Sequence, residues 1–413
     1  MSIRCRYAPS PTGNQHIGGL RTALFNYLLA RSPHGAAAGA PDGGERRFIL
    51  RLEDTDRSRY DAAFVKDLYD TFDWIGFRWD EGPDSGGPAA PYVQSERFDL
   101  YAGFAAQLLE SGAAYRCFCT AARLDAVRAE RDAARARGEA GASESGYDRH
   151  CRALDAREAA SRAASGEAYV IRLKIPLEET TRFTDALLGD ISWKNSDISP
   201  DPVLIKSDGF PTYHLANIVD DHLMGITHVL RAQEWLSSTP LHVILYKAFG
   251  WQPPLFCHLP MVVGADGKKL SKRHGSTSVQ EFRRAGYLPA ALVNYVALLG
   301  ASYQEGKDIY SLDELAALFS LAKLNKAPAV FDYKKLDWFN SQYIKAAPDE
   351  VLAQAVLPYM VEAGIFAGGE ADGRQFALLC AAMPLIKERA VRLTEIPAKI
   401  AFVFNDPPVA PPE

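Results

Sequence analysis

Residues 9–19 read PSPTGNQHIGG, and they stand between a short apolar stretch and a run with helical spacing. The apolar stretch, residues 3–8, predicts a buried strand. Apolar side chains in residues 20–31 recur three or four positions apart, which predicts a helix. A strand, a glycine-containing turn and a helix in this order form the first unit of a nucleotide-binding α/β fold. The chain is therefore expected to begin with a Rossmann-type sheet.

His16 lies just ahead of that helix and is followed by Gly18 and Gly19. Glycine lets a phosphate approach the backbone, and the N-terminus of a helix adds partial positive charge. An imidazole at this point can donate a hydrogen bond to a phosphate oxygen. An isolated motif of this kind is more often a turn with structural glycines. The preceding strand and a second, distant motif favour the phosphate interpretation.

The second motif is KKLSKR, residues 268–273, in a loop between Gly264 and Gly275. The two ammonium groups of Lys269 and Lys272 suit a triphosphate whose charge redistributes as pyrophosphate leaves. By itself the loop could be an ordinary basic surface loop. Together with residues 9–19, in this order, it predicts an ATP site.

Bulk composition is that of a globular protein of two to four domains, with 413 residues, 47% of them hydrophobic and 23% charged. No apolar run approaches the length of a membrane span, and residues 1–6 lack the apolar core of a signal peptide. We therefore expect a cytoplasmic protein without a membrane partner. Six cysteines are too few for a disulfide framework. The net charge of −5 does not exclude nucleic acid, because phosphate attraction depends on local basic patches.

Periodicity and turn residues place the remaining elements. Expected strands cover residues 48–52, 169–175, 183–193 and 227–231. Expected helices cover residues 62–75, 98–112, 121–140, 211–224, 239–250, 289–300, 333–343, 349–363 and 373–388. Residues 183–193 are expected to extend the sheet of residues 169–175, and no strand is expected after about residue 275. Residues 220–222, Asp-Asp-His, are expected to cap the end of their helix locally.

Four stretches carry a family resemblance: RYAPSPTG (6–13), RLEDTD (51–56), PTYHLAN (211–217) and VLRAQEW (229–235). They resemble the bacterial and organellar glutamyl-tRNA synthetases, which are class I aminoacyl-tRNA synthetases. The resemblance runs from about residue 3 to 345. The related glutaminyl enzymes open with Pro-Glu-Pro-Asn-Gly in place of residues 9–13, which favours glutamate.

The resemblance implies a glutamate site lined by Arg6, Ser10, Glu53, Tyr213, Asn217 and Arg231. The chemistry agrees, because two arginines can fork onto the two carboxylates of glutamate and a carboxylate can take its ammonium group. A buried arginine also rejects the neutral amide of glutamine. The alternatives are a surface ion pair for Arg231 and a buried polar pair for Tyr213 and Asn217.

The resemblance also implies an ATP site, formed by His16, Gly18, Glu234, Lys269, Leu270 and Lys272, with Mg²⁺. His16, Lys269 and Lys272 are then the catalytic residues. The α-carboxylate of glutamate attacks the α-phosphorus of ATP, and the terminal ribose of tRNA(Glu) attacks the resulting adenylate. No side-chain general base is needed, so catalysis rests on positioning and charge stabilisation. A monomer is expected.

Cys117 and Cys119, with Cys151 further on, resemble the zinc knuckle of some family members. Zinc needs four ligands, and the usual fourth position, two residues beyond the third cysteine, is an alanine here. Some relatives use a Tyr-x-x-x-Cys spacing, which Tyr147 and Cys151 match. His150 is a competing ligand, and three buried thiols without metal are the remaining alternative.

The expected fold is α/β: a Rossmann-type class I synthetase catalytic domain with an α+β insertion, followed by an all-helical C-terminal part. The corresponding ranges are 1–97 and 212–253 for the catalytic halves, 98–211 for an acceptor-end-binding insertion, 254–332 for a stem-contact region and 333–413 for the start of a helical anticodon-binding domain. Because family members usually continue further, a truncated or unusually short chain is expected.

Two other functions compete with a glutamate–tRNA ligase. One is the paralogue that glutamylates a modified tRNA base, which lacks the helical C-terminal part and usually has an eroded lysine loop. The other is an inactive tRNA-binding protein, against which the intact His16, Lys269 and Lys272 argue. A dinucleotide-dependent oxidoreductase would need Gly-x-Gly-x-x-Gly after the first strand, and that spacing is absent from the sequence.

Overall fold

The computed structural model describes residues 2–34, 44–56, 59–138, 147–366 and 371–404. The chain divides into two compact units, each assembled from three separate stretches. The first unit consists of Met1–Pro11, Pro41–Tyr60 and Trp79–His258, and the second of Thr12–Ala40, Asp61–Arg78 and Leu259–Glu413.

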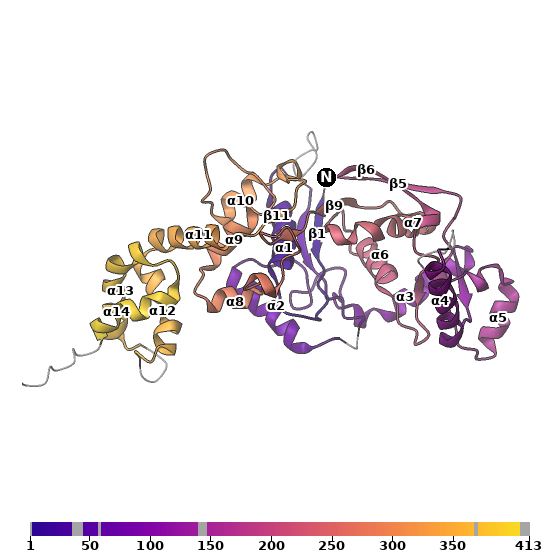
Figure 1. The fold of residues 1–413 in the computed structure, drawn as a ribbon, viewed down its shortest axis with the longest axis horizontal. Coiled ribbons are helices and arrows are strands. Elements are labelled where there is room, and N and C mark those ends of the chain that lie inside the picture. The colour runs from indigo at the N-terminus through magenta and orange to yellow at the C-terminus, as the bar shows by residue number, and fades with distance from the viewer. Residues whose placement is uncertain (1, 35–43, 57–58, 139–146, 367–370, 405–413) are drawn as a thin grey trace, which may run out of the picture. The chain divides into compact units, whose positions relative to one another are not determined.

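A six-stranded sheet runs through the first unit, in the order β2-β1-β8-β9-β5-β6 (Figure 1). Strand β1 (Ile3–Tyr7) pairs in parallel with both β2 (Arg46–Leu50) and β8 (His228–Ala232). The three strands are largely buried, as expected of parallel strands in an α/β fold. The prediction of a Rossmann-type α/β fold is confirmed. The carboxyl ends of β1, β2 and β8 meet at one edge, where ligands bind in open sheets of this kind.

The expectation that residues 183–193 extend the sheet of residues 169–175 is wrong. Strands β5 (Thr180–Asp185) and β6 (Gly189–Lys194) form a hairpin, and β5 joins the six-stranded sheet through a parallel contact with β9 (Leu255–Leu259). Local alternation of side chains predicts a strand but not its partner, which is set here by a segment some 70 residues further along the chain.

Residues 169–175 instead supply β4 (Val170–Leu173), the middle strand of a separate antiparallel sheet in the order β3-β4-β7. Its neighbours are β3 (Ala114–Cys117) and β7 (Val203–Ile205). Two solvent-facing helices belong to the same stretch of chain, α4 (Ala121–Ala136) and α5 (Ala156–Ala164). Residues 98–211 therefore contribute strands to two different sheets.

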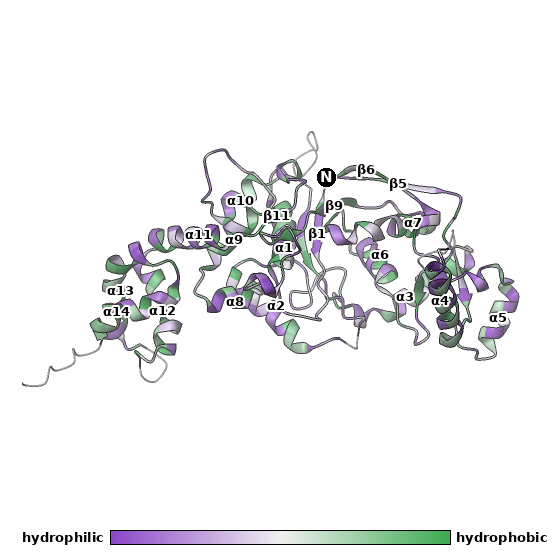
Figure 2. Cartoon of the chain, in the orientation of Figure 1, coloured by the Kyte–Doolittle hydropathy of each residue, from purple (hydrophilic) through white to green (hydrophobic). Residues whose placement is uncertain are grey.

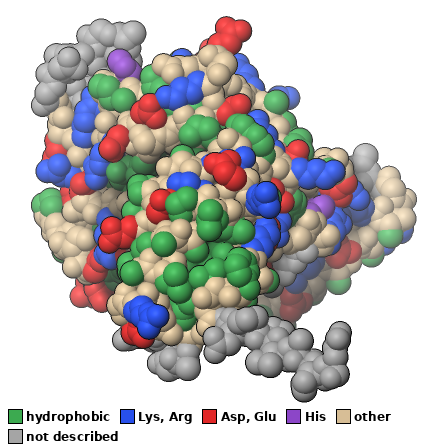
Figure 3. Space-filling view, turned by 90° about the vertical axis from the view of Figure 1, so that its left-hand side faces the viewer, with side chains coloured by type: hydrophobic (Ala, Val, Ile, Leu, Met, Phe, Trp, Pro, Cys, Tyr) green, Lys and Arg blue, Asp and Glu red, His purple; other side chains and the backbone are tan. Residues whose placement is uncertain are grey.

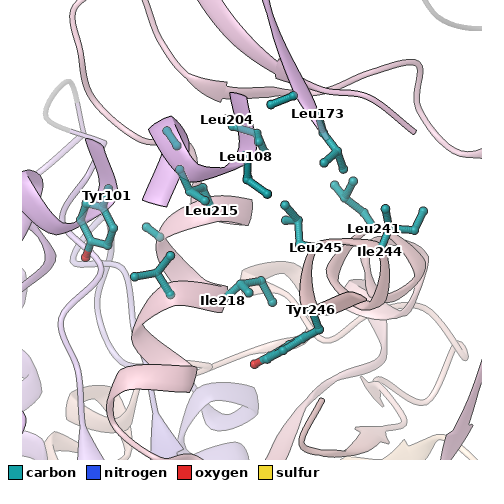
Figure 4. Packing of buried hydrophobic residues seen from close by; sticks show 14 of the residues in the cluster. Tyr101, Leu108, Leu173, Leu204, Leu215, Ile218, Leu241, Ile244, Leu245 and Tyr246 are labelled. Carbon is teal, nitrogen blue, oxygen red and sulfur yellow. The ribbon is translucent and has the colours of Figure 1, made fainter. Parts of the chain in front are cut away.

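An apolar cluster of the first unit lies among three helices, as Figure 4 shows. They are α3 (Phe98–Glu110), α6 (Tyr213–Leu223) and α7 (Thr239–Phe249). Side chains from β4 and β7, such as Leu173 and Leu204, enter the same cluster. The small sheet thus shares its core with α6, the helix that carries two of the predicted glutamate-site residues.

The second unit is mostly helical. Its helices are α1 (Ile17–Arg31), α2 (Ala62–Ile75), α8 (Val279–Arg284), α9 (Pro289–Ala297), α10 (Leu312–Leu318), α11 (Tyr333–Ala346), α12 (Asp349–Glu362), α13 (Gly373–Ile386) and α14 (Ile396–Phe404). The absence of strands after residue 275 was predicted wrongly, because the two-residue strand β11 (Ala329–Val330) pairs in parallel with β10 (Val262–Val263). A strand this short leaves no periodic pattern in the sequence.

Helices α12 to α14 enclose their own apolar cluster, to which α11 contributes Ile344. Green and purple faces alternate around these helices in Figure 2, as expected of amphipathic helices. Some apolar side chains remain outside the cluster: Leu385 and Phe402 are each 76% exposed, and Figure 3 shows hydrophobic side chains gathered on the face turned to the viewer. No helix in the described ranges is long and apolar enough to span a membrane.

Candidate active site

Two buried arginines lie at the carboxyl edge of β1 and β2, and both form ion pairs with the same aspartate. Nε of Arg6 lies 3.0 Å from Oδ1 of Asp221 on α6, and Nη1 of Arg51 lies 2.7 Å from the same oxygen. Burial alone would raise the pKa of Asp221, but the attraction of Arg6 and Arg51 outweighs it and the pKa is lowered. An ionised Asp221 therefore fixes both guanidinium groups.

Glu53 joins this network through one carboxylate oxygen. Its Oε1 accepts hydrogen bonds from Nη2 of Arg51 and from Nδ2 of Asn217, both at 3.0 Å. Burial raises the pKa of Glu53, and the attraction of Arg51 offsets only part of that effect. Ser10 donates its hydroxyl hydrogen to the backbone oxygen of Glu53 at 2.8 Å. The structure thus brings Ser10, Glu53 and Asn217 together with Arg6.

Arg231 on β8 is 5% exposed and has a different kind of surroundings. Its Nε donates to Nε2 of His258 at 3.1 Å and its Nη2 to the hydroxyl of Thr239 at 2.8 Å. Its Nη1 lies 3.3 Å from the hydroxyl of Tyr213 and 3.2 Å from Nδ1 of His242. Its Nη2 also lies 3.3 Å from the backbone oxygen of Trp235, and all five partners are neutral groups. Within the described part of the chain, no carboxylate forms an ion pair with Arg231.

The histidines around Arg231 stay uncharged near neutral pH. Burial lowers the pKa of His242 well below its ordinary value, and burial lowers the pKa of His214, which lies 3.2 Å from His242, to about 4. Burial also lowers the pKa of Arg231, and the charge of Arg6 lowers it further. A buried cation with only neutral neighbours is costly, and a carboxylate is the group that would compensate it. The alternative of a surface ion pair for Arg231 is therefore wrong.

The face of α6 that lines this site repeats every fourth residue, as Tyr213, Asn217 and Asp221. The prediction that residues 220–222 only cap their helix is wrong, because Asp220 and Asp221 are both buried and bind arginines far away in the sequence. Asp220 accepts from Nε of Arg97 at 2.7 Å. The four-residue spacing that pairs Tyr213 with Asn217 also reaches Asp221, and it is the signal by which that residue could have been found.

His16 belongs to the second unit and caps α1. Its Nδ1 accepts a hydrogen bond from the backbone N–H of Gly19 at 3.1 Å, which leaves the ring proton on Nε2. A methyl group at Gly18 would lie 3.1 Å from Cε1 and 3.2 Å from Nδ1 of His16. The glycine therefore makes room for the imidazole of His16 against the helix end.

The lysine loop, residues 264–275 of the second unit, reverses the direction of the chain directly after β10. Gly264 donates its N–H to the backbone oxygen of Lys268 at 2.9 Å, and Leu270 donates to that of Val262 at 3.0 Å. Lys269 is exposed, whereas Leu270 is half-buried. The backbone of Lys272 starts a short 3₁₀ helix, and its side chain lies outside the part of the structure that is described. The backbone of the loop is thus ordered by its own hydrogen bonds.

The two predicted phosphate motifs lie side by side although about 250 residues separate them. Ile17 donates its N–H to the backbone oxygen of Thr277 at 3.0 Å, and Val279 donates to that of Gln15 at 2.9 Å. His16 is thereby placed beside the segment that leaves the lysine loop. Glu234, also predicted for ATP, belongs to the first unit, where it lies exposed in the 3₁₀ helix Gln233–Ser238.

The three cysteines of the predicted knuckle form a cluster. The sulfur atoms of Cys117, Cys119 and Cys151 all lie within 4.8 Å of one another, and those of Cys119 and Cys151 are 3.6 Å apart. Tyr147 packs in the same cluster, and its hydroxyl lies 3.2 Å from that of Tyr115. His150 is exposed and does not join the group of sulfur atoms. The geometry suits a metal ion with sulfur ligands.

A cavity of about 470 Å³ lies in the first unit between the small sheet and the start of α6. Its lining includes Leu124, Arg128, Tyr147, Arg172, Tyr213 and His214. Tyr147 comes from the cysteine cluster, whereas Tyr213 contacts Arg231. One cavity therefore borders both the predicted metal knuckle and the predicted glutamate site.

A family model described as the catalytic domain of class I tRNA synthetases (E and Q) matches residues 2–338. Among curated relatives, the glutamate–tRNA ligase of Treponema denticola is 54% identical over 431 residues, which cover 100% of this chain and 82% of the relative.

Two solved structures are also similar. The glutamate–tRNA synthetase of Elizabethkingia anophelis has a TM-score of 0.85 and 38% identity, over 99% of this chain and 82% of that chain. The glutamate tRNA ligase of Elizabethkingia meningosepticum, solved in complex with its amino acid, has a TM-score of 0.85 and 39% identity, over 98% and 81%.

Proposed function

This chain belongs to the class I tRNA synthetases for glutamate and glutamine, and from that premise we propose that its two units bind glutamate and the phosphates of ATP. The protein is an ATP-dependent, AMP-forming ligase that joins glutamate to tRNA. An oxygen of the glutamate α-carboxylate attacks the α-phosphorus of ATP, the bond to the β-phosphate oxygen breaks, and pyrophosphate leaves. The terminal ribose hydroxyl of the tRNA then attacks the adenylate and releases AMP.

One observation supports glutamate as the amino-acid substrate: Arg231 is a buried cation surrounded by neutral groups. Every acceptor around it provides a hydrogen bond, but none provides negative charge. A side-chain carboxylate of the substrate supplies that charge, and Tyr213 stands beside the same nitrogen to share it. The amide of glutamine would leave the buried cation uncompensated, so the site discriminates against glutamine.

The remaining glutamate-site residues orient the backbone end of the substrate. Arg6 is anchored by Asp221 on one side and offers its other N–H groups to a carboxylate. Glu53 has one oxygen bound by Arg51 and Asn217, and its second oxygen can accept the ammonium group. Ser10 lies at the edge of the site, held by the backbone of Glu53.

The phosphate chemistry belongs to the motifs of the second unit. His16 keeps its proton on Nε2 and can donate it to a phosphate oxygen, while Lys269 and Lys272 stabilise the charge that develops on the departing pyrophosphate. Gly18 and Leu270 belong to the same unit and are proposed for the same site, whereas Glu234 is proposed for ATP from the first unit. Mg²⁺ fits as the counter-ion of ATP, because this ion is usually bound by substrate phosphates rather than by an all-protein cage. When bound, it neutralises phosphate charge.

The cysteine cluster fits zinc. Zinc–sulfur bonds of about 2.3 Å place the sulfur atoms of a tetrahedral site about 3.8 Å apart, close to the separation seen between Cys119 and Cys151. Cys117 is the third ligand, and the position of Tyr147 supports it over the exposed His150 as the fourth. We expect about one equivalent of zinc per chain, lost in Cys117→Ser, as measured by elemental analysis of purified protein.

The cavity beside Tyr213 supports the placement of the tRNA acceptor end. Arg128 and Arg172 supply positive charge and Tyr147 and Tyr213 supply aromatic faces, which together suit a stacked nucleotide. Residues 98–211 would then bind the acceptor end, residues 254–332 contact the stem and residues 333–413 begin the anticodon-binding part. A monomer acting in the cytoplasm completes the proposal.

Glutamate-dependent exchange of pyrophosphate into ATP, with and without tRNA(Glu), tests the proposal. Exchange that requires both glutamate and tRNA is expected. Exchange without tRNA would point to the paralogue that modifies a tRNA base. A protein that binds tRNA but shows no exchange under either condition would contradict the ligase activity.

A further inference from the structure

Behind Arg231, on the side of His258, lies a buried pair that the proposed reaction does not use. Nδ1 of His258 on β9 lies 2.6 Å from Oδ2 of Asp185 at the end of β5. Both side chains are completely buried. Asp185 arrives there because β5 joins the six-stranded sheet at this point, where it lies opposite Phe256.

Asp185 is fixed by four donors. Its Oδ1 accepts from the backbone N–H groups of Leu187 and Leu188 at 2.9 Å each, and its Oδ2 accepts from the backbone N–H and from Nδ1 of His258. Burial alone would raise the pKa of Asp185, but its bond to His258 and these N–H groups lower it instead. Asp185 is therefore an ionised group that can only accept hydrogen bonds.

An ionised Asp185 decides which nitrogen of His258 carries the proton. The proton must be on Nδ1, so Nε2 presents a lone pair to Nε of Arg231 at 3.1 Å. Burial lowers the pKa of His258, which keeps the ring neutral. The hydroxyl of Thr239 accepts from Nη2 of Arg231 at 2.8 Å, and its own proton can go to the backbone oxygen of Trp235 at 3.2 Å or to Nε2 of His258 at 3.0 Å.

We propose that Asp185 and His258 are positioning residues for amino-acid selection, which anchor Arg231 through a neutral imidazole. A carboxylate bound directly to Arg231 would orient it equally well but would neutralise the charge that distinguishes glutamate from glutamine. Arg6 and Arg51 are not proposed to distinguish glutamate from glutamine, and both form ion pairs directly with Asp221. The inference rests on the proposed function and adds the residues that keep Arg231 both oriented and positive.

Two substitutions at His258, made in the full chain, separate the polar role from packing. His258→Leu removes the acceptor for Arg231 and is expected to raise the KM for glutamate in tRNA-dependent exchange about tenfold or more. The kcat and the KM for ATP should stay within about twofold, because Arg231 binds the substrate equally in the ground and transition states. His258→Gln keeps an acceptor for Arg231 and a donor for Asp185, so its KM should stay within about threefold.

His228→Leu is the matched control, because His228 is a buried imidazole on the same strand as Arg231 but makes no contact with it. His228→Leu should lower the thermal stability about as much as His258→Leu does, but it should leave the KM for glutamate unchanged. Equal effects of His228→Leu and His258→Leu, or an unchanged KM in His258→Leu, would overturn the proposal. No glutamate-dependent exchange in the unaltered protein would instead contradict the proposed function.

The tautomer can be observed without relying on any variant's activity. In protein labelled with ¹⁵N at histidine, the ring signals that disappear in His258→Gln report on this residue. We expect a proton on Nδ1 and none on Nε2. A proton on Nε2 in the unaltered protein would overturn the proposal, because His258 could then not accept from Arg231.

Discussion

Four of the side chains proposed for glutamate, those of Arg6, Glu53, Asn217 and Arg231, are buried and bonded to other side chains. The side chains of His16 and Lys269, proposed for the ATP phosphates, are exposed instead. Arg6 and Arg231 are 4% and 5% exposed, and each bonds a side chain far away in the sequence, Asp221 for Arg6 and His258 for Arg231. His16 and Lys269 are exposed, and their loops are fixed by hydrogen bonds between backbone groups.

This difference follows from what each ligand requires. Discrimination between a carboxylate and an amide depends on one charge, and a charge acts strongly only where water is excluded. Phosphate groups carry several charges and must be released as pyrophosphate, so exposed cations on a loop serve them. Substitutions in the first region should therefore disturb binding and folding, and those in the second should mainly slow the reaction.

Arg231→Met gives the largest expected effect and tests the buried half of the comparison. It removes the charge while keeping an unbranched side chain, so kcat/KM for glutamate in tRNA-dependent exchange should fall about 1,000-fold. Arg182→Met, at an exposed position of β5, is the control and should have little effect. A loss below tenfold would mean that the carboxylate is recognised elsewhere.

Asp221→Asn should destabilise the first unit. The substitution leaves Arg6 and Arg51 without their shared carboxylate, and removing one partner of a buried ion pair costs about 3–5 kcal/mol. Urea unfolding measures this loss. Asp208→Asn removes an exposed aspartate and should cost less than about 1 kcal/mol. Similar values for the two variants would show that the arginines are stabilised by other groups.

Lys269→Ala tests the exposed half. We expect kcat to fall about 100-fold, as for other groups that stabilise charge in the transition state. Because the side chain is exposed, the thermal midpoint should not change. Lys268→Ala, beside it in the same loop, is the control. Equal loss of kcat in both variants would indicate general attraction of ATP instead of a specific contact.

Gly18→Ala should have the smallest effect. Its methyl group would lie 3.1 Å from the ring of His16, which must shift by a few tenths of an ångström. The KM for ATP should rise about threefold, while the added alanine changes the stability of α1 by about 1 kcal/mol or less. Gly13→Ala, where nothing lies within 4 Å, should leave the KM unchanged. A rise in the KM for glutamate would show that the glutamate and phosphate regions do not act independently.

Sequence reasoning located most elements, because they leave local patterns, and the family resemblance predicted the six residues that we propose for glutamate. Helices such as α2 and α7 have regular apolar spacing and recognisable ends, and Gly250 closes α7 in the left-handed conformation. The stretches at 9–19 and 268–273 also indicated the phosphate motifs. Helix α14 was not predicted, and β11 is too short to leave a pattern.

By itself, the sequence predicted side chains with the chemistry for glutamate and ATP and located most of the helices. Only the tertiary structure decided which polar groups meet. Arg6 and Asp221 are 215 positions apart, and Asp185 reaches His258 because β5 pairs with β9 instead of continuing the smaller sheet. A buried charge has to find its partner wherever the fold brings one, and nothing in the local spacing of residues records that partner.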